Sequence, residues 1–166
     1  MNPAYILLAF VVVERVAELV ISNRHTRRLL AEGAVEAGAE HYRYFVLLHG
    51  GWLVAMFALM HPDTPIYWPP LVLYILLSVA RAWVVTSLGR YWTTRVITLP
   101  NAPLVKRGPY RFIRHPNYAV VTGEVLVLPL VFGFWNVALV FSALNLVLLR
   151  FRIRVEDAAL NPRRSA

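Results

Sequence analysis

The most constraining feature of the sequence is a series of five apolar blocks, each close in length to the thickness of a bilayer. The blocks cover residues 3–21, 44–60, 69–89, 118–134 and 135–149. About 17–25 apolar residues cross the hydrocarbon core as a helix, and β-barrel strands would instead alternate polar and apolar residues. Only 16% of the residues are charged, against about a quarter in soluble domains. We therefore predict an all-α integral membrane protein with about five transmembrane helices.

The last two blocks run almost without interruption from Tyr118 to Leu149. One helix of that length would be about twice as long as a bilayer is thick. Gly133 and the Trp135-Asn136 pair are the candidates for a turn. The sequence thus predicts that the last two spans form a helical hairpin.

The net charge of +8 has an uneven distribution that predicts the topology. If the N-terminus is outside, 15 of the 17 basic residues fall in the first loop, the third loop and the C-terminal tail, which ends with Arg163 and Arg164. The outer segments around Asp63 and Gly133 have none. This is the positive-inside pattern. It places the N-terminus outside and the C-terminus in the cytosol, and it predicts the bilayer rather than nucleic acid as the partner of the basic residues.

Several absences narrow the possibilities further. The chain has no cysteine, which excludes disulfides and thiolate metal sites, and we predict no metal site. The first block lacks a basic leader and is interrupted by Glu14 and Glu18, so we expect it to remain as a span rather than to be cleaved. No internal repeat is visible, and residues 1–166 are expected to form a single domain.

Five charged residues lie inside the apolar blocks: Glu14, Arg15, Glu18, Arg81 and Glu124. Charged groups at membrane depth are costly, and they usually face a bundle interior or a wet cavity. Arg81 can neutralise one of the glutamates and lock the packing of the helices. Glu124 is the strongest candidate for a function, because it lies close in sequence to an unusual loop.

That loop covers residues 91–117 and holds four prolines interleaved with aromatic residues. The prolines oppose a continuing helix, and a disordered linker would be poor in aromatic residues. A loop of this length is usually functional. Gly108-Pro109-Tyr110 and the run from Arg114 to Tyr118 form its central part.

A second group of polar residues follows the fifth block. If the helix continues into the cytosol, Arg152 and Glu156 lie four residues apart on one face. The hairpin would return this face to the side of the membrane that holds the proline-rich loop. Either the two residues form an exposed salt bridge on a solvated helix end, or a carboxylate and a guanidinium converge with the His115-Pro116 turn.

The two motifs together resemble the isoprenylcysteine carboxyl methyltransferase family. The resemblance rests on Gly108-Pro109-Tyr110, the run from Arg114 to Tyr118, and the run from Glu156 to Leu160. Related patterns occur in phospholipid methyltransferases and, more distantly, in sterol reductases, which use NADPH. The segments at residues 14–24 and 36–42 resemble a short bacterial branch associated with type III polyketide synthases, whose members methylate alkylpyrones or alkylresorcinol-like lipids.

The resemblance implies a cofactor-binding part at about residues 90–160 that takes S-adenosyl-L-methionine and releases S-adenosyl-L-homocysteine. The implied cofactor residues are Leu104, Val105, Tyr110, His115, Pro116, Asn117, Tyr118 and Glu156. The catalytic candidates are Arg152, Glu124 and Arg114. Two positions depart from the family pattern: Asp157 replaces a second glutamate, and Ala102 replaces a polar or histidine residue.

We therefore predict methyl transfer to a hydroxyl, enol or carboxylate oxygen of a lipophilic substrate, with an alkylpyrone-like polyketide lipid as the first choice. An ionised acceptor needs orientation, for which Arg152 is suited, whereas a phenol needs a base, for which Glu124 and His115 are the candidates. Carboxyl or phospholipid methylation is the alternative within enzymes, and a small transporter or assembly protein is the alternative of another class. The expected location is a bacterial cytoplasmic membrane, with the substrate entering from the bilayer.

Overall fold

The structure is a computed structural model that describes residues 2–100 and 102–164, with side chains up to residue 161. The side chains of Arg163 and Arg164, which contribute to the predicted charge asymmetry, lie outside the described part. The elements in chain order are α1 (Pro3–Ala31), β1 (Val35–Ala37), α2 (Ala39–Leu59), α3 (Trp68–Leu88), the 3₁₀ turn η1 (Gly89–Tyr91), β2 (Val96–Thr98), the 3₁₀ turn η2 (Gly108–Arg111), α4 (Pro116–Val131) and α5 (Trp135–Arg164).

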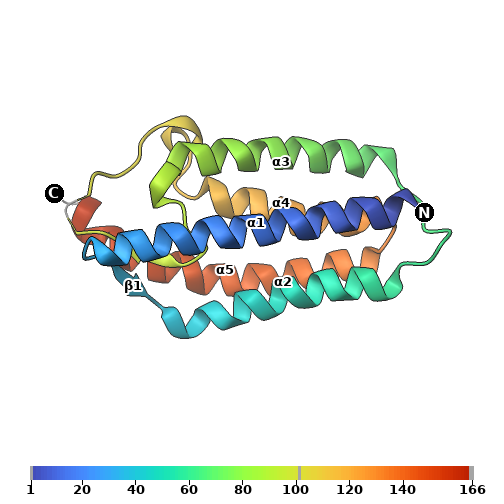
Figure 1. The fold of residues 1–166 in the computed structure, drawn as a ribbon, viewed down its shortest axis with the longest axis horizontal. Helices are drawn as coiled ribbons and strands as arrows, with labels where there is room; N and C mark the ends of the chain where they lie inside the picture. The colour runs from blue at the N-terminus through green and yellow to red at the C-terminus, as the bar shows by residue number, and fades with distance from the viewer. Residues whose placement is uncertain (1, 101, 165–166) are drawn as a thin grey trace.

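The five helices lie side by side and alternate in direction (Figure 1). The end of α1, β1, the proline-rich loop and the end of α5 all meet at the end of the bundle where the C-terminus lies, and the N-terminus lies at the opposite end. We call the end with these loops the loop end. Residues far apart in the sequence thus meet there, as the hairpin prediction requires.

Three helical segments are long and apolar enough to cross a membrane: Ala39–Leu59, Trp68–Tyr91 and Trp135–Asn161. The remaining apolar helix, Pro116–Val131, has 16 residues, and α1 carries Glu14, Arg15 and Glu18 near its middle. Many large apolar side chains face outward, as Leu47 and Val79 do with 69% and 63% of their surface exposed. Because water would oppose such exposure, this outer surface suits lipid. The prediction of a largely helical membrane protein is confirmed.

The predicted hairpin is present, and α4 is its buried partner. The turn between Val131 and Trp135 contains Gly133 with φ of 78°, a backbone conformation that favours glycine. The short helix α4 packs against both α3 and α5 and buries Val125, Leu128 and other residues in the core. Its central position explains why a 16-residue helix is stable here.

A two-stranded sheet departs from the purely helical prediction. Val35 pairs with Thr98, and Ala37 pairs with Val96, in an antiparallel register. Arg95 also donates to Glu36 at 3.0 Å across the pair. Strands of three residues are too short to leave a periodic pattern in the sequence. The pairing fastens the connection between α1 and α2 to the loop that follows α3.

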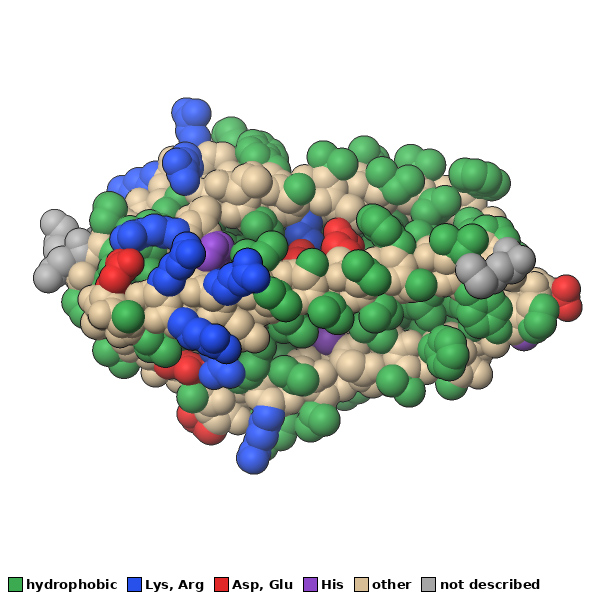
Figure 2. Space-filling model, viewed as in Figure 1, with side chains coloured by type: hydrophobic (Ala, Val, Ile, Leu, Met, Phe, Trp, Pro, Cys, Tyr) green, Lys and Arg blue, Asp and Glu red, His purple; other side chains and the backbone are tan. Residues whose placement is uncertain are grey.

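Basic side chains gather toward the loop end (Figure 2). The middle of the same face is mostly hydrophobic, apart from acidic and basic side chains that lie together between α1 and α3. The first observation agrees with the charge asymmetry of the sequence. The charged side chains between α1 and α3 belong to a group of ion pairs at membrane depth.

Candidate functional site

The larger of two neighbouring cavities lies at the loop end and has a volume of about 560 Å³. We call it the polar cavity. Its walls come from the segment after α3, the proline-rich loop, the start of α4 and the last turns of α5. Nine of the site residues predicted from the sequence line it: Leu104, Val105, Tyr110, Arg114, His115, Asn117, Tyr118, Arg152 and Glu156. Two segments that are more than thirty residues apart in sequence are thus brought to one site.

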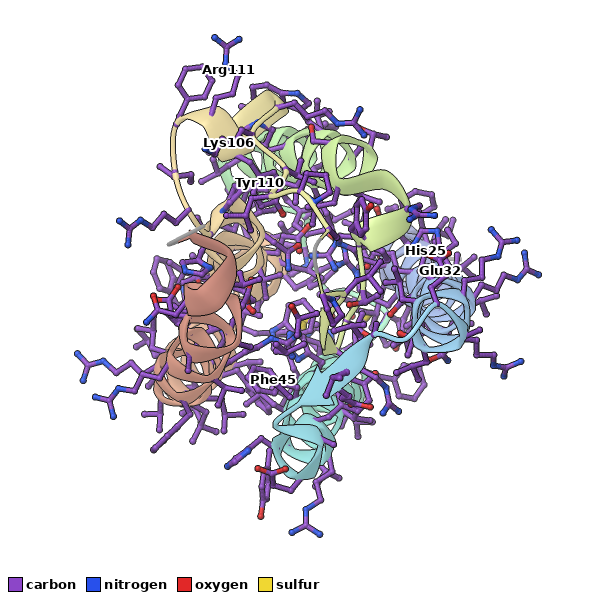
Figure 3. The ribbon with its side chains drawn as sticks, turned by 90° about the vertical axis from the view of Figure 1, so that its left-hand side faces the viewer. His25, Glu32, Phe45, Lys106, Tyr110 and Arg111 are labelled. Carbon is purple, nitrogen blue, oxygen red and sulfur yellow. The ribbon has the colours of Figure 1, made fainter. Side chains whose placement is uncertain are left out.

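The proline-rich loop is held against α3 by contacts around Gly108. Arg107 donates through Nε to the carbonyl oxygen of Ser87 at 2.7 Å. Gly108 has φ of 56°, and a Cβ added there would lie 2.0 Å from Oγ of Ser87. In the view from the loop end, Tyr110 lies on the inner side of the loop and Arg111 points outward (Figure 3). Glycine at position 108 therefore allows the close approach that brings Tyr110 to the cavity.

Tyr118 lies at the centre of the polar contacts. Its hydroxyl donates a short hydrogen bond to the Glu156 carboxylate and accepts one from Nε of Arg152 at 2.9 Å. The second guanidinium nitrogen of Arg152 donates to the carbonyl oxygen of Thr94 at 2.7 Å. The predicted i, i+4 pair of Arg152 and Glu156 is therefore bridged through Tyr118 and does not form an exposed salt bridge.

His115 lies beside this group, and Asp157 and Tyr118 fix its orientation. Its Nε2 is 3.2 Å from Oδ1 of Asp157, and its ring stacks on that of Tyr118 with centroids 5.4 Å apart. Nδ1 is 3.8 Å from a Glu156 oxygen. The aspartate that departs from the family pattern thus provides the carboxylate that holds this imidazole.

Tyr110 provides a neutral hydroxyl to the same cavity. Burial, with a smaller contribution from the Glu156 carboxylate, raises the pKa of Tyr110 above its ordinary value. The phenol therefore keeps its proton at physiological pH and is available as a hydrogen-bond donor.

The second cavity has a volume of about 260 Å³ and lies deeper in the bundle. We call it the apolar cavity, because its exposed wall is mainly apolar. All five helices contribute to it. Five residues line both cavities and form the boundary between them: Trp92, Thr93, Asn117, Tyr118 and Arg152. A molecule in the apolar cavity would therefore meet a molecule in the polar cavity at Arg152 and Tyr118.

An ion-pair cluster, which we define as Glu14, Arg15, Glu18, Arg81 and Glu124, adjoins the apolar cavity, and all of its residues except Glu14 line the wall. Arg81 donates to Glu124 at 2.8 Å and also binds Glu18, and Arg15 contacts Glu124 at 3.3 Å. Arg15 also bonds to Glu14 and Glu18. Arg81 thus neutralises glutamates, a possibility that the sequence left open, and the cluster ties α1 to α3 and α4.

Several buried polar atoms around the two cavities have no hydrogen-bond partner among the described residues. They are Nε1 of Trp52 and Trp92, the hydroxyl of Tyr74 and Oδ1 of Asn117. All four residues line at least one cavity. A buried polar atom without a partner costs about 1–3 kcal/mol. Four such atoms around two cavities are typical of a site whose hydrogen bonds are completed by ligands.

Comparison with known proteins agrees with the geometry. Residues 70–162, more than half of the chain, match the isoprenylcysteine carboxyl methyltransferase (ICMT) family. The chain belongs to this family. The matched region contains both the proline-rich loop and the last turns of α5, which line the polar cavity. Membership in the ICMT family implies a membrane-associated methyltransferase that uses S-adenosylmethionine.

Two curated relatives align along nearly the whole chain. An uncharacterized protein of Bacillus subtilis strain 168, YpbQ, is 37% identical over 160 residues, which cover 94% of this chain and 95% of the relative. An uncharacterized protein of Haemophilus influenzae Rd is 25% identical over 161 residues and covers 94% of both chains. No solved structure matches the chain.

Two of the residues predicted for the ICMT site lie apart from the others. Pro116 is buried as the first residue of α4, where proline suits a helix start, and does not line the polar cavity. Glu124 lies on the wall of the apolar cavity, in the ion-pair cluster. Arg114 lines the polar cavity with an exposed side chain.

Apart from Arg81, the residues that α2 and α3 contribute to the apolar cavity could not be predicted from a sequence motif. His49, Trp52 and Tyr74 line the apolar cavity. One pattern in the sequence does mark His49, because it is an ionisable side chain in the middle of an apolar block. Trp52 and Tyr74 have no such mark, since aromatic residues are common in membrane helices.

Proposed function

We propose that this ICMT-family protein transfers a methyl group from S-adenosyl-L-methionine to an oxygen of a lipophilic acceptor at the cytosolic membrane face. The observation that carries the proposal is the contact between a polar cavity at the loop end and an apolar cavity inside the helices, at Arg152 and Tyr118. Such a pair of cavities suits a reaction between one water-soluble and one lipid-soluble molecule.

The residues of the polar cavity fit the proposed cofactor. Its volume of about 560 Å³ lies within the range of about 300–1,000 Å³ for small-molecule sites. The Glu156 carboxylate suits the ribose hydroxyls or the ammonium group, and the exposed guanidinium of Arg114 suits the carboxylate. Asn117 offers a buried carbonyl oxygen without a partner, which can accept from an amino group.

The apolar cavity fits the acceptor. We infer that the lipid enters from the bilayer, because all five helices line this cavity at membrane depth. The unpartnered donors of Trp52 and Tyr74 suit oxygen atoms on the head of the lipid. Together with the resemblance of residues 14–24 and 36–42 to the polyketide-associated branch, this favours an alkylpyrone-like acceptor.

Arg152 supports a second acceptor type equally well. Its guanidinium lines both cavities, and guanidinium groups bind carboxylates in a bidentate manner. A lipid carboxylate of the isoprenylcysteine kind therefore stays as the alternative acceptor. In either case Arg152 would hold the acceptor oxygen at the boundary between the cavities.

The chemistry needs mainly positioning. The cofactor supplies a methyl group on a sulfonium centre, from which an in-line displacement leaves S-adenosyl-L-homocysteine. Fixing two reactants in line can supply about 7–11 kcal/mol of the barrier reduction. In this chain Tyr118 and Arg152 are themselves fixed by hydrogen bonds to Glu156 and Thr94. They form a rigid boundary against which both reactants are held.

We further propose that α1 and α4 cross the membrane with the three longer apolar helices, with the N-terminus outside and the loop end in the cytosol of a bacterial cell. The chain has no native cysteine, so single-cysteine variants report without background. A cysteine at Asp63 should react with an impermeant maleimide from outside, and one at Lys106 only after the cells are opened. The reverse pattern would overturn this topology.

The first test is equilibrium binding of S-adenosyl-L-homocysteine to purified protein in lipid nanodiscs, with NADPH as the comparison. We expect saturable binding of S-adenosyl-L-homocysteine alone, and binding about 10-fold weaker or more in Glu156→Gln because a charge-assisted hydrogen bond is lost. Glu40→Gln is the matched control, since the Glu40 side chain is 69% exposed. Binding of NADPH instead would contradict the proposal.

The second test is methyl transfer from labelled S-adenosyl-L-methionine to long-chain acceptors in the same nanodiscs. An alkylpyrone and a farnesylated cysteine derivative represent the two acceptor types. We expect methylation of the alkylpyrone. Methylation of the carboxylate alone would move the protein to the isoprenylcysteine type, and methylation of neither would overturn the proposed reaction.

A further inference from the structure

His49 places an imidazole on the wall of the apolar cavity. It lies in α2, is half-buried, and contacts the ring of Trp52 edge-on with centroids 6.5 Å apart. A histidine at membrane depth beside a cavity calls for a physical account, because polar groups there are costly.

A backbone hydrogen bond fixes the tautomer of His49. Its Nδ1 is 2.9 Å from the carbonyl oxygen of Phe45, one turn earlier in α2. A carbonyl oxygen only accepts, so Nδ1 carries the proton. Nε2 then has a free lone pair and, on the opposite side of the ring, faces away from the backbone of its own helix. The neutral ring is thus arranged to accept a proton at Nε2.

Phe45 also relates His49 to the boundary between the cavities. The guanidinium carbon of Arg152 lies 5.0 Å from the centroid of the Phe45 ring. Phe45 lies between α2 and α5 in the view from the loop end (Figure 3). His49 follows four residues later, which is about 6 Å further along the helix. An acceptor head in the apolar cavity would therefore lie beside Arg152 at one side and His49 at the other.

The other proton acceptors on this wall are already engaged. Glu124 binds the guanidinium groups of Arg81 and Arg15, and Glu18 binds the same two groups. A proton taken up by either carboxylate would break these ion pairs. The three tyrosines of the wall, Tyr42, Tyr74 and Tyr118, carry their own protons. His115, the other candidate from the sequence, lines the polar cavity and is held by Asp157.

A lipid acceptor that reacts through a hydroxyl or enol needs a base. Its hydroxyl or enol comes from the hydrocarbon core as the neutral form, because a charge in that medium is strongly disfavoured. The oxygen must lose its proton to become an effective nucleophile.

We propose that His49 is the general base that removes the acceptor proton, an inference that rests on the proposed function. Nε2 of His49 takes the proton of the acceptor hydroxyl, and the imidazole ring becomes an imidazolium ion. The acceptor oxygen forms a bond to the methyl carbon, and the carbon–sulfur bond breaks with its electron pair going to sulfur. The imidazolium then releases its proton to water through the polar cavity. The net change is one ether, one S-adenosyl-L-homocysteine and one proton.

The test uses three phenols that carry the same long alkyl chain and differ in acidity: unsubstituted, chloro-substituted and nitro-substituted. Native enzyme, His49→Gln and His61→Gln are compared in nanodiscs. His61 lies in the exposed loop after α2 and provides the matched control. We expect His49→Gln to lower kcat by about 10²–10⁴-fold with the least acidic phenol, and much less with the nitrophenol, which gives up its proton more readily.

A second measurement separates this role from a structural one. Equilibrium binding of S-adenosyl-L-homocysteine and of the unsubstituted alkylphenol, each measured alone, should be the same in His49→Gln and native protein. An equal loss of turnover with all three phenols, or no loss with any, would overturn the role of His49 while leaving the methyltransferase reaction in place. Failure of the native enzyme to methylate any of the phenols would overturn the role of His49 and the phenol or enol acceptor together.

Discussion

The two cavities of this protein are built in different ways. The polar cavity is made mostly from one stretch of chain, residues 88–118, closed by the last turns of α5. The apolar cavity is made from single residues on five helices, such as Leu19, His49 and Leu149. The first is thus encoded largely by a contiguous motif, and the second by the packing of the helices together with Trp92, Thr93 and Thr94 of the loop.

This difference indicates which part of the site can change most easily. A contiguous loop binds a fixed partner, because its turns and prolines hold many groups in one arrangement. A cavity lined by scattered helix positions can change its shape by one substitution without loss of the loop. We expect the cofactor to be common to relatives and the acceptor to vary.

The largest predicted effect comes from removing the guanidinium group of Arg81, which joins α3 to α1 and α4. Arg81→Met leaves Glu18 and Glu124 without a principal partner. Breaking a buried ion pair costs about 3–5 kcal/mol, and we expect a loss of that order in unfolding free energy, measured by denaturation in mixed micelles. Arg90→Met is the control, because the Arg90–Glu32 pair is exposed and screened by solvent. Equal losses in the two variants would contradict a structural role for the cluster.

A substitution at Gly108 tests whether the polar cavity depends on its loop alone. Gly108→Ala places a Cβ 2.0 Å from Oγ of Ser87, at a φ of 56°. A left-handed backbone costs a residue with a side chain about 1–2 kcal/mol, and the clash adds to this. We expect binding of S-adenosyl-L-homocysteine to weaken more than about 10-fold, with alkylphenol binding retained.

The control for Gly108→Ala is Gly51→Ala, whose Cβ would lie 3.7 Å from Phe141 in ordinary contact. Normal cofactor binding in Gly108→Ala would show that the loop can rearrange. The polar cavity would then not depend on a fixed loop, and the proposed difference between the two cavities would not hold.

Filling the apolar cavity tests whether this cavity binds the acceptor independently of the cofactor. Val121 lines the apolar cavity and not the polar one. Overpacking costs about 1–3 kcal/mol, so Val121→Phe should weaken acceptor binding about 10-fold or more and leave S-adenosyl-L-homocysteine binding unchanged. Val79→Phe serves as the control, since Val79 faces outward with 63% exposure. Equal weakening of both ligands would mean that the cavities act as one.

The smallest predicted effect is a pH dependence of stability due to Tyr110. Because burial raises the pKa of Tyr110 above its unfolded value of about 10, its contribution is complete below pH 10 and is lost as the pH rises further. Tyr110→Phe should therefore lose less thermal stability than native protein above pH 10. Tyr67→Phe, at an exposed position, should behave like native protein. Parallel alkaline losses in all three proteins would contradict a buried Tyr110.

The sequence predicted most of the polar cavity and little of the apolar one. Tyr110, His115 and Glu156 belong to motifs with recognisable spacing, and the hairpin brought them together as expected. The contacts of Arg15 with Glu14, Glu18 and Glu124 could not be predicted from the sequence, because Glu124 lies 109 residues away and reaches Arg15 only through helix packing. Trp52 and Tyr74 could not be predicted, because they join the site only through the relative rotation of helices that share no sequence motif.

The ion-pair cluster also has a consequence for how the protein is made. α1 leaves the ribosome before α3 and α4, and it carries Glu14, Arg15 and Glu18 in the middle of its apolar stretch. Glu18 meets Arg81 across 63 residues of chain, and Arg15 meets Glu124 across 109. Each charged residue at the bilayer centre raises the cost of insertion by about 2.5–3.5 kcal/mol. If α1 crosses the membrane as proposed, it is poorly held in the bilayer until α3 and α4 have been synthesised, so its stable insertion waits for partners that come later in translation.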